Sequence, residues 1–122
     1  MYKVSVAESF EAAHYLRGYR GKCENIHGHR FKVVVTISTV KLNEIGLAFD
    51  FVELKGHLRE ILASFDHTCL NEISYFSQIN PSSENIATTI YEHLESRLPK
   101  DNVNLESVEI WESPQNRVTY SR

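Results

Sequence analysis

The 122-residue sequence predicts an α+β fold in which a four-stranded antiparallel sheet carries two helices on one face. Two observations lead to this fold class. Strand patterns at both ends of the chain flank two amphipathic helix patterns, in the order strand, strand, helix, helix, strand, strand. No linker-like or repeated segment interrupts that order, so residues 1–122 are expected to form a single domain. The open edges of such a small sheet would invite pairing with other subunits.

The first part of the chain supplies two strands. Residues 2–10 alternate between apolar and polar side chains, and a polar, glycine-bearing stretch at 17–25 indicates a loop. Residues 30–40 give the strongest strand pattern, because β-branched residues dominate there. The apolar face of this second strand consists of Phe31, Val33, Val35 and Ile37.

Two helix patterns follow. The first covers about 51–64, where Asp50 can cap the N-terminus. The second begins after Pro81 and is ended by Pro99. Their apolar stripes are Leu54, Leu58, Ile61, Leu62 and Phe65 in the first helix, and Ile86, Ala87, Ile90, Tyr91, Leu94 and Leu98 in the second.

The second helix and the last two strands are also delimited by the sequence. Ser82 or Ser83 should act as the N-cap, and Glu84 falls in the first turn, where a carboxylate suits the helix dipole. Strand patterns return at 105–112 and 117–121. The Ser-Pro-Gln-Asn sequence between them is expected to form a turn.

The composition excludes several classes of protein. A net charge of −3 and a pI near 6.1 give no support to a general nucleic-acid binder. The first residues lack the apolar run of a signal peptide, and no stretch approaches the roughly 20 apolar residues of a membrane span. We therefore expect a cytoplasmic protein with no nucleic-acid or membrane partner. Cys23 and Cys69 are too few to build a disulfide scaffold.

Three of the six histidines form a candidate metal site. His27 and His29 precede the strongest strand pattern, and on an extended backbone such residues point to the same side about 7 Å apart. His14 follows the first strand pattern and would complete the set if the two strands pair. Three imidazoles with a fourth position open are typical of a catalytic zinc site. The alternative is a chance His-x-His pair with structural roles, as we expect for His57 and His93.

Four further residues have side chains suited to catalysis or binding. Cys23 lies in the polar loop four residues before His27, where a nearby cation would favour its thiolate; the alternative is a small buried side chain. Asp66 precedes His67 and could orient it for acid–base catalysis, or the two could be a polar pair at a helix end. Glu112 ends a strand pattern, where it could accept hydrogen bonds from two adjacent N–H groups or face solvent.

Six segments together resemble a known family. They are Phe-Glu-Ala-Ala-His at 10–14, Cys-Glu-Asn-Ile-His-Gly-His at 23–29, Asp-Phe-Val-Glu-Leu-Lys at 50–55, Asp-His-Thr-Cys-Leu-Asn at 66–71, Pro-Ser-Ser-Glu-Asn at 81–85, and Glu112. In this order, over nearly the whole chain, they resemble the 6-pyruvoyl-tetrahydropterin synthase family. The resemblance is greatest to its 6-carboxy-tetrahydropterin synthase branch, which serves queuosine (7-deazaguanine) biosynthesis. It implies the tunnelling fold, whose sheets join edge to edge into barrels, commonly as homohexamers with sites between subunits.

The resemblance also implies a role for each matching residue. His14, His27 and His29 would hold a Zn²⁺ ion. Cys23 would be the base that removes a proton from the substrate side chain, and Asp66 with His67 would be its partner dyad, supplied by another subunit. The pterin ring would be anchored by Glu112, in a pocket lined by Ser82, Ser83 and Glu84.

The implied reaction is a zinc-dependent lyase step on a pterin triphosphate. It converts 7,8-dihydroneopterin triphosphate to 6-carboxy-5,6,7,8-tetrahydropterin and releases acetaldehyde and triphosphate. Three residues separate Cys23 from His27, as in the carboxy-forming branch, whereas the pyruvoyl-forming branch has a longer spacing. Glu24 resembles a variant that forms 6-hydroxymethyl-dihydropterin for folate synthesis, or it is a solvated loop residue.

Other functions stay open at this point. A 6-pyruvoyl-tetrahydropterin synthase, a bifunctional enzyme and a non-catalytic pterin-binding module are the alternatives. Arg17, Arg20 and Lys22 could supply positive charge to the triphosphate, or form a solvated loop face.

Overall fold

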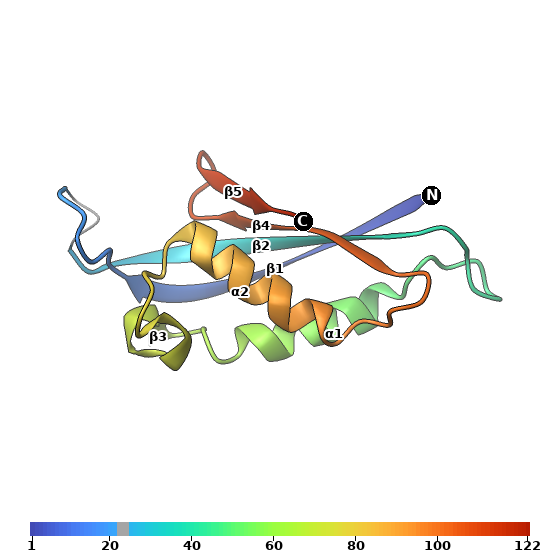
Figure 1. The fold of residues 1–122 in the computed structure, drawn as a ribbon, viewed down its shortest axis with the longest axis horizontal. Coiled ribbons are helices and arrows are strands. Elements are labelled where there is room, and N and C mark those ends of the chain that lie inside the picture. Colours follow the sequence, from blue (N-terminus) through green and yellow to red (C-terminus); the bar gives the residue numbers. More distant parts are fainter. Residues whose placement is uncertain (22–24) are drawn as a thin grey trace.

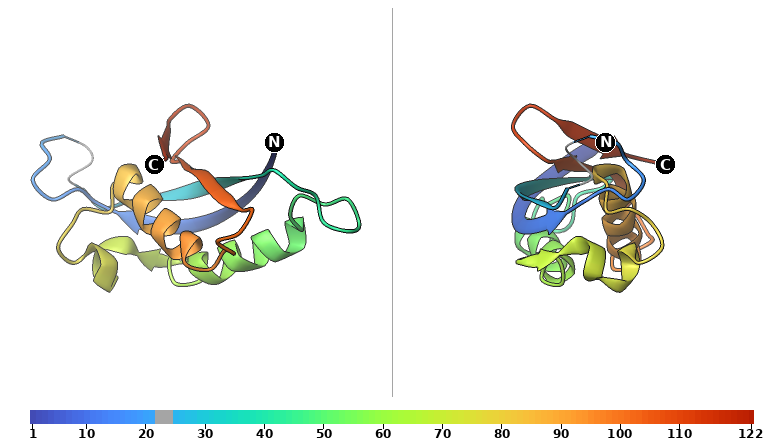
Figure 2. Two further views of the ribbon diagram at one scale, coloured as in Figure 1. Left: turned by 45° about the vertical axis from the view of Figure 1, so that its right-hand side comes forward. Right: turned by 90° about the vertical axis from the view of Figure 1, so that its left-hand side faces the viewer.

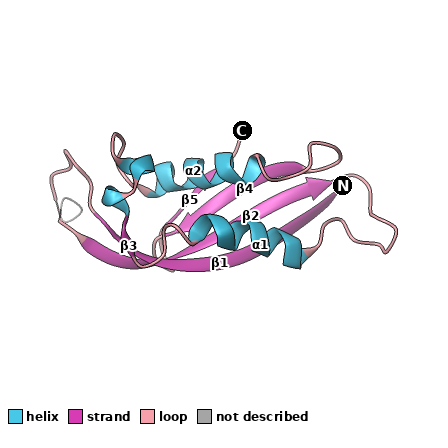
Figure 3. Cartoon of the chain, turned by 90° about the horizontal axis from the view of Figure 1, so that it is seen from below, coloured by secondary structure: helices cyan, strands magenta, loops and turns pink. Residues whose placement is uncertain are grey.

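The fold is a twisted sheet with two helices packed against one face (Figures 1 and 3). The computed structural model describes residues 1–21 and 25–122. Short 3₁₀ turns occupy Leu70–Glu72 and Ser74–Phe76. The strands are β1 (Tyr2–His14), β2 (His27–Thr39), β3 (Thr68–Cys69), β4 (Asn104–Trp111) and β5 (Arg117–Tyr120), and the helices are α1 (Phe51–Leu62) and α2 (Ser83–Glu95).

The sheet has the strand order β3-β1-β2-β4-β5. The pairs β1–β2, β2–β4 and β4–β5 are antiparallel, whereas β3 runs parallel to β1 beside Ala12 and Ala13. The α+β class and the two helices on one face are confirmed. The prediction of a four-stranded, wholly antiparallel sheet was wrong by one strand, because a two-residue strand is too short to produce an alternating pattern.

Strands β1 and β2 are longer than their apolar alternation predicts. Their pairing continues from Tyr2 opposite Thr39 to His14 opposite His27. His14 is therefore the last residue of β1 rather than a residue that follows it. Backbone hydrogen bonds extend the ladder into a polar region because they do not depend on apolar side chains.

The core lies between the sheet and the two helices. Alternate residues of β2, from Phe31 to Ile37, are fully buried on the helix-covered face. The Asp50 carboxylate accepts a hydrogen bond from the Val52 N–H at 2.8 Å and caps α1. At the start of α2 the Ser82 hydroxyl accepts from the Asn85 N–H at 3.1 Å, so Ser82 rather than Ser83 is the N-cap.

No described helix covers the other face of the sheet (Figure 2). Because side chains alternate along a strand, Arg30 and Lys32 of β2 and Trp111 of β4 lie on this face. The Lys32 ammonium lies 4.2 Å from the centre of the Trp111 indole ring, a cation–π distance. Neither of the described helices has the length and apolar character needed to cross a bilayer.

Burial in α1 gives a matched test of the core. Leu58→Ala should lower the free energy of unfolding by about 2–5 kcal/mol, because Leu58 is completely buried and its loss leaves a cavity. Val52→Ala in the same helix should change it by less than about 0.5 kcal/mol, because Val52 is 76% exposed. Urea unfolding followed by circular dichroism measures both. Equal losses in the two variants would contradict the placement of α1.

Candidate metal centre

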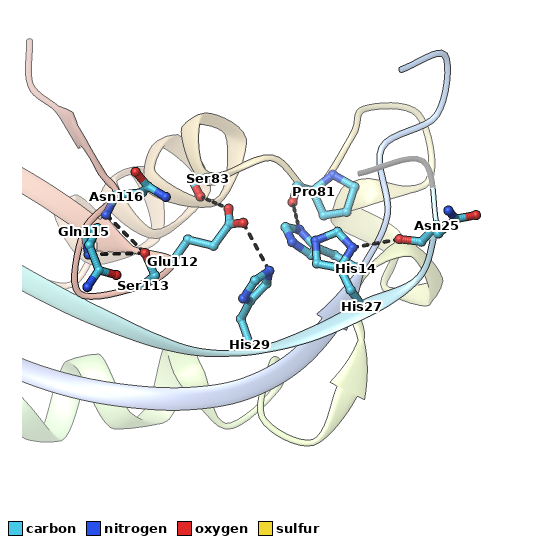
Figure 4. Close-up of polar contacts among 10 residues, drawn as sticks. All are labelled: His14, Asn25, His27, His29, Pro81, Ser83, Glu112, Ser113, Gln115 and Asn116. Atoms are coloured by element: carbon cyan, nitrogen blue, oxygen red, sulfur yellow. Dashed lines mark hydrogen bonds and ion pairs between the residues drawn. The ribbon is translucent and has the colours of Figure 1, made fainter. Parts of the chain in front are cut away.

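Three histidines converge at the end of the β1–β2 ladder (Figure 4). His14 lies directly opposite His27 in the antiparallel pairing, and His29 is two residues further along the same face of β2. Their ring centres are 4.5 Å apart for His14 and His27, 4.7 Å for His27 and His29, and 5.4 Å for His14 and His29. The strand register therefore brings together the three side chains that the sequence predicted as metal ligands.

Backbone carbonyls fix the protonation of two of these rings. Nδ1 of His14 lies 2.7 Å from the Pro81 carbonyl oxygen, and Nδ1 of His27 lies 2.7 Å from that of Asn25. A carbonyl oxygen can only accept, so each Nδ1 carries the hydrogen and donates it. In the neutral ring, Nε2 is then left with a free lone pair. Metal-binding histidines commonly have this arrangement, in which one nitrogen is held by the protein and the other faces the ion.

Glu112, the residue that follows β4, completes the group. Its Oε1 lies 3.1 Å from Nε2 of His29, and its Oε2 accepts a hydrogen bond from the Ser83 hydroxyl at 3.0 Å. One ligand atom from each of four residues, the three histidines and Glu112, lies within 4.8 Å of the other three. Three imidazole nitrogens and one carboxylate oxygen are a donor set that suits zinc and similar divalent ions.

Two ring nitrogens in this group are buried without a hydrogen bond. Nε2 of His14 and Nε2 of His29 have no hydrogen-bond partner among the described residues. The contact from His29 to Glu112 is short enough for an ion pair but does not have the angle of an N–H···O hydrogen bond. An unpaired buried polar atom is costly, and a bound cation would satisfy both nitrogens. The residues present therefore fit a metal ion.

Burial also favours the metal-binding form of the histidines. Loss of solvent lowers the pKa of His14, despite the opposing effects of its hydrogen bond to Pro81 and of the charge on Glu112. The pKa of His29 is lowered for the same main reason, again against Glu112. Both rings are therefore mostly neutral at pH 7, and only the neutral ring has a lone pair to give to a metal.

A cavity adjoins the histidines. It has a volume of about 230 Å³ and lies between the end of β1, the start of β2, the start of α2 and the turn after β4. Ser82, Ser83 and Glu84, which the sequence predicted as pocket residues, all line it. Its other lining residues include His14, His27, Glu112, Asn116 and Arg117.

Asp66 and His67 lie elsewhere in this chain. The Asp66 carboxylate accepts a hydrogen bond from the Glu11 N–H at 2.8 Å and lies 3.0 Å from Nδ1 of His67. Both contacts hold the pKa of Asp66 below its ordinary value, and the hydrogen bond from Glu11 has the larger effect. His67 also lies 3.6 Å from the Glu11 carboxylate. Glu11 and His14 point to opposite faces of β1, so Asp66 and His67 lie toward the uncovered face of the sheet. The structure does not bring them into the histidine group.

Two predicted catalytic residues fall outside the described part of the chain. Cys23 and Glu24 belong to residues 22–24, which separate the two described ranges. Their proposed roles therefore depend on the sequence alone.

Sequence reasoning missed a group of hydrogen bonds next to the histidine end of the sheet, made by Asn71, Asn80 and Arg17 and here called the brace. The Asn71 amide pairs with both backbone groups of Tyr15, and the Asn80 amide pairs with both backbone groups of Arg17, at 2.9–3.0 Å. The Arg17 guanidinium, a candidate for binding triphosphate, instead donates to three carbonyls, those of Asn71, Phe76 and Ile79. Isolated polar residues carry no periodic signal, so no pattern in the sequence could identify this brace.

Residues 3–122 match the sequence profile of a family described as 6-pyruvoyl tetrahydropterin synthase. The chain belongs to this family.

Individual members of the family resemble the chain over most of its length. A relative from Archaeoglobus fulgidus, provisionally named 6-carboxy-5,6,7,8-tetrahydropterin synthase, is 41% identical to this chain. The alignment covers 90% of this chain and 87% of the relative. A Synechocystis relative named 6-carboxy-5,6,7,8-tetrahydropterin synthase is 36% identical, and the alignment covers 92% of this chain and 87% of that relative. The structure of Caenorhabditis elegans 6-pyruvoyl tetrahydropterin synthase superimposes with a TM-score of 0.87 at 29% identity, covering 99% of this chain and 95% of that one. The family resemblance predicted from the motifs is confirmed.

The brace gives a stability prediction. Arg17→Met keeps the aliphatic stem but removes the donors to three carbonyls, so the free energy of unfolding should fall by about 1–3 kcal/mol. Lys100→Met, at an exposed position, is the matched control and should change it by less than about 0.5 kcal/mol. Thermal and urea unfolding of metal-free protein measure both. An Arg17 variant as stable as the control would show that these hydrogen bonds contribute nothing.

Proposed function

We propose that this protein is a zinc-dependent lyase that acts on 7,8-dihydroneopterin triphosphate. The products would be 6-carboxy-5,6,7,8-tetrahydropterin, acetaldehyde and triphosphate, for queuosine biosynthesis. The observation that carries the proposal is the convergence of three imidazoles, two of them oriented by backbone carbonyls, beside a cavity. The names of the Archaeoglobus and Synechocystis relatives favour the carboxy-forming branch.

His14, His27 and His29 would hold the ion and leave a position for substrate. When bound, zinc would act as a Lewis acid on the hydroxyl oxygens of the substrate side chain. The carbon that becomes the carboxyl group is oxidised while the ring is reduced from the dihydro to the tetrahydro level, with uptake of one water. The reaction therefore needs no nicotinamide or flavin.

Glu112 would anchor the pterin ring. A carboxylate can accept two parallel hydrogen bonds, here from the exocyclic amino group and the neighbouring ring N–H. The Ser83 hydroxyl, which donates to Oε2, would help to orient the carboxylate. Ser82 and Glu84 line the same cavity and would contact the substrate from the start of α2.

Cys23 would take the proton from the side-chain carbon, and His67 would exchange protons with the substrate oxygen. Asp66 lies 3.0 Å from Nδ1 of His67 and would hold that ring in one orientation. His67 has a backbone φ of 57°, which lies in the left-handed region that residues other than glycine rarely adopt. Such conformations cluster at functional sites, which supports a role for this pair.

A second subunit would complete the site. We infer that residues 1–122 form one domain that assembles into a cytoplasmic homohexamer, in which the pair reaches the histidines of a neighbour. The cavity volume of about 230 Å³ supports this, because pockets that enclose a small molecule usually measure roughly 300–1,000 Å³.

The decisive test is a product assay with zinc-loaded protein. Incubation with 7,8-dihydroneopterin triphosphate should yield 6-carboxy-tetrahydropterin and acetaldehyde, identified by mass spectrometry. His27→Ala should abolish both products and reduce the zinc retained after dialysis, because it removes one ligand. Its circular dichroism should stay native, because His27 is not part of the apolar core.

The other outcomes are equally informative. A 6-pyruvoyl product would favour the pyruvoyl-forming alternative. Pterin binding without turnover would favour the binding module. No zinc in the native protein after reconstitution would refute the metal site.

Glu24, next to Cys23 in the sequence, favours a second activity that forms 6-hydroxymethyl-dihydropterin for folate synthesis. We expect Cys23→Ala to lose acetaldehyde release but still bind pterin, because Glu112 and the histidines remain. Any hydroxymethyl product should disappear in Glu24→Ala and survive in part in Cys23→Ala. Mass spectrometry distinguishes the two products. Native carboxy production by Cys23→Ala would refute Cys23 as the base, and a Glu24→Ala variant with unchanged products would leave Glu24 without a role.

A further inference from the structure

We propose that Glu112 is a fourth ligand of the metal in the substrate-free protein and leaves it when a pterin ring binds. This inference rests on the proposed function of the same site. It adds an exchange of one carboxylate between the metal and the substrate ring.

The position of Glu112 carries the first step of the argument. Its Oε1 and Nε2 of His29 are 3.1 Å apart (Figure 4). Ligands about 2.0–2.1 Å from a tetrahedral zinc ion lie about 3.3 Å from one another. The two atoms therefore have the separation of neighbouring ligands on one ion.

The chemistry of that contact carries the second step. It lacks the angle of an N–H···O hydrogen bond, and Nε2 of His29 has no hydrogen-bond partner among residues 1–21 and 25–122. With its hydrogen on Nδ1, the position that the carbonyl contacts fix in His14 and His27, a neutral His29 ring presents a lone pair at Nε2 to the carboxylate oxygen. Two such atoms at this distance repel each other unless a proton or a cation lies between them, and a metal ion supplies that cation.

Ser83 holds the carboxylate in a geometry that suits one-oxygen binding. Its hydroxyl donates to Oε2, so that oxygen has a partner and Oε1 is left for the ion. Ser83 is itself buried and is the first residue of α2, where the helix dipole favours a negative charge. The same serine would stay within reach of the carboxylate after it turns toward a ligand in the cavity.

The two roles of Glu112 compete for Oε1. The pterin anchor uses both carboxylate oxygens for the exocyclic amino and ring N–H groups, whereas metal ligation directs Oε1 at the ion. Ring binding would therefore draw the carboxylate away from the ion and open a position for the side-chain hydroxyls as the substrate arrives. In the resting protein the fourth position would be closed.

Cobalt(II)-substituted protein tests the exchange without relying on turnover, because its visible spectrum reports the ligands of the ion. The probe is pterin itself, which lacks side-chain hydroxyls and cannot replace Glu112 on the metal. Adding pterin should shift the native spectrum. Glu112→Gln should differ from the native spectrum before any addition and should not shift further. Glu84→Gln, an acidic neighbour in the same cavity but outside the ligand group, is the matched control and should start from the native spectrum.

Zinc affinity tests the ligation separately. In competition with a chelator, Glu112→Gln should bind zinc about tenfold or more weakly than native protein, and Glu84→Gln should bind it equally well. Unchanged zinc affinity in Glu112→Gln overturns the ligation, and a native cobalt spectrum that pterin does not alter overturns the exchange. Native product formation with either negative result rejects this inference alone. The expected spectra without product formation reject the reaction but keep the exchange.

Discussion

The register of the β1–β2 pairing is the constraint on which the site depends. Phe10 and Phe31 are direct partners in this ladder, and their buried rings stack with centres 4.9 Å apart on the helix-covered face. A slip of one residue would move every side chain of a strand to the opposite face. The aromatic packing that stabilises the sheet therefore also keeps His14, four residues later in β1, opposite His27, four residues earlier in β2.

The burial of His14 beside the core has an energetic consequence. His14 is only 2% exposed, and its Nε2 has no hydrogen-bond partner in the described part of the chain. Leaving such an atom unpaired costs about 1–3 kcal/mol in the metal-free protein. The same burial keeps the ring neutral and able to bind a cation. Stability and metal binding therefore oppose each other at this residue, as is common at functional sites.

The sequence predicted those features that depend on local patterns. The order of the two helices and the four longer strands, the cap at Asp50, the serine cap of α2 and the His-x-His pair all follow from short-range spacing. Features that depend on the pairing of distant segments could not be predicted in this way. Glu112 reaches His29 because Trp111 pairs with Lys32 across β2 and β4, a register that neither strand pattern specifies. The Asn71, Asn80 and Arg17 brace likewise joins segments more than 50 residues apart.

The two faces of the sheet set a limit on what one chain can do. His14 lies on the helix-covered face of β1, whereas Glu11, which contacts Asp66 and His67, lies on the other face. Strand alternation separates these faces regardless of side-chain rotamer. The separation of these faces therefore supports the proposal that the pair of one chain acts with the histidines of another. The sheet ends in β3 on one side and β5 on the other, and each edge strand has backbone groups that no strand within the described sheet pairs. A neighbouring chain joined at such an edge would satisfy those groups.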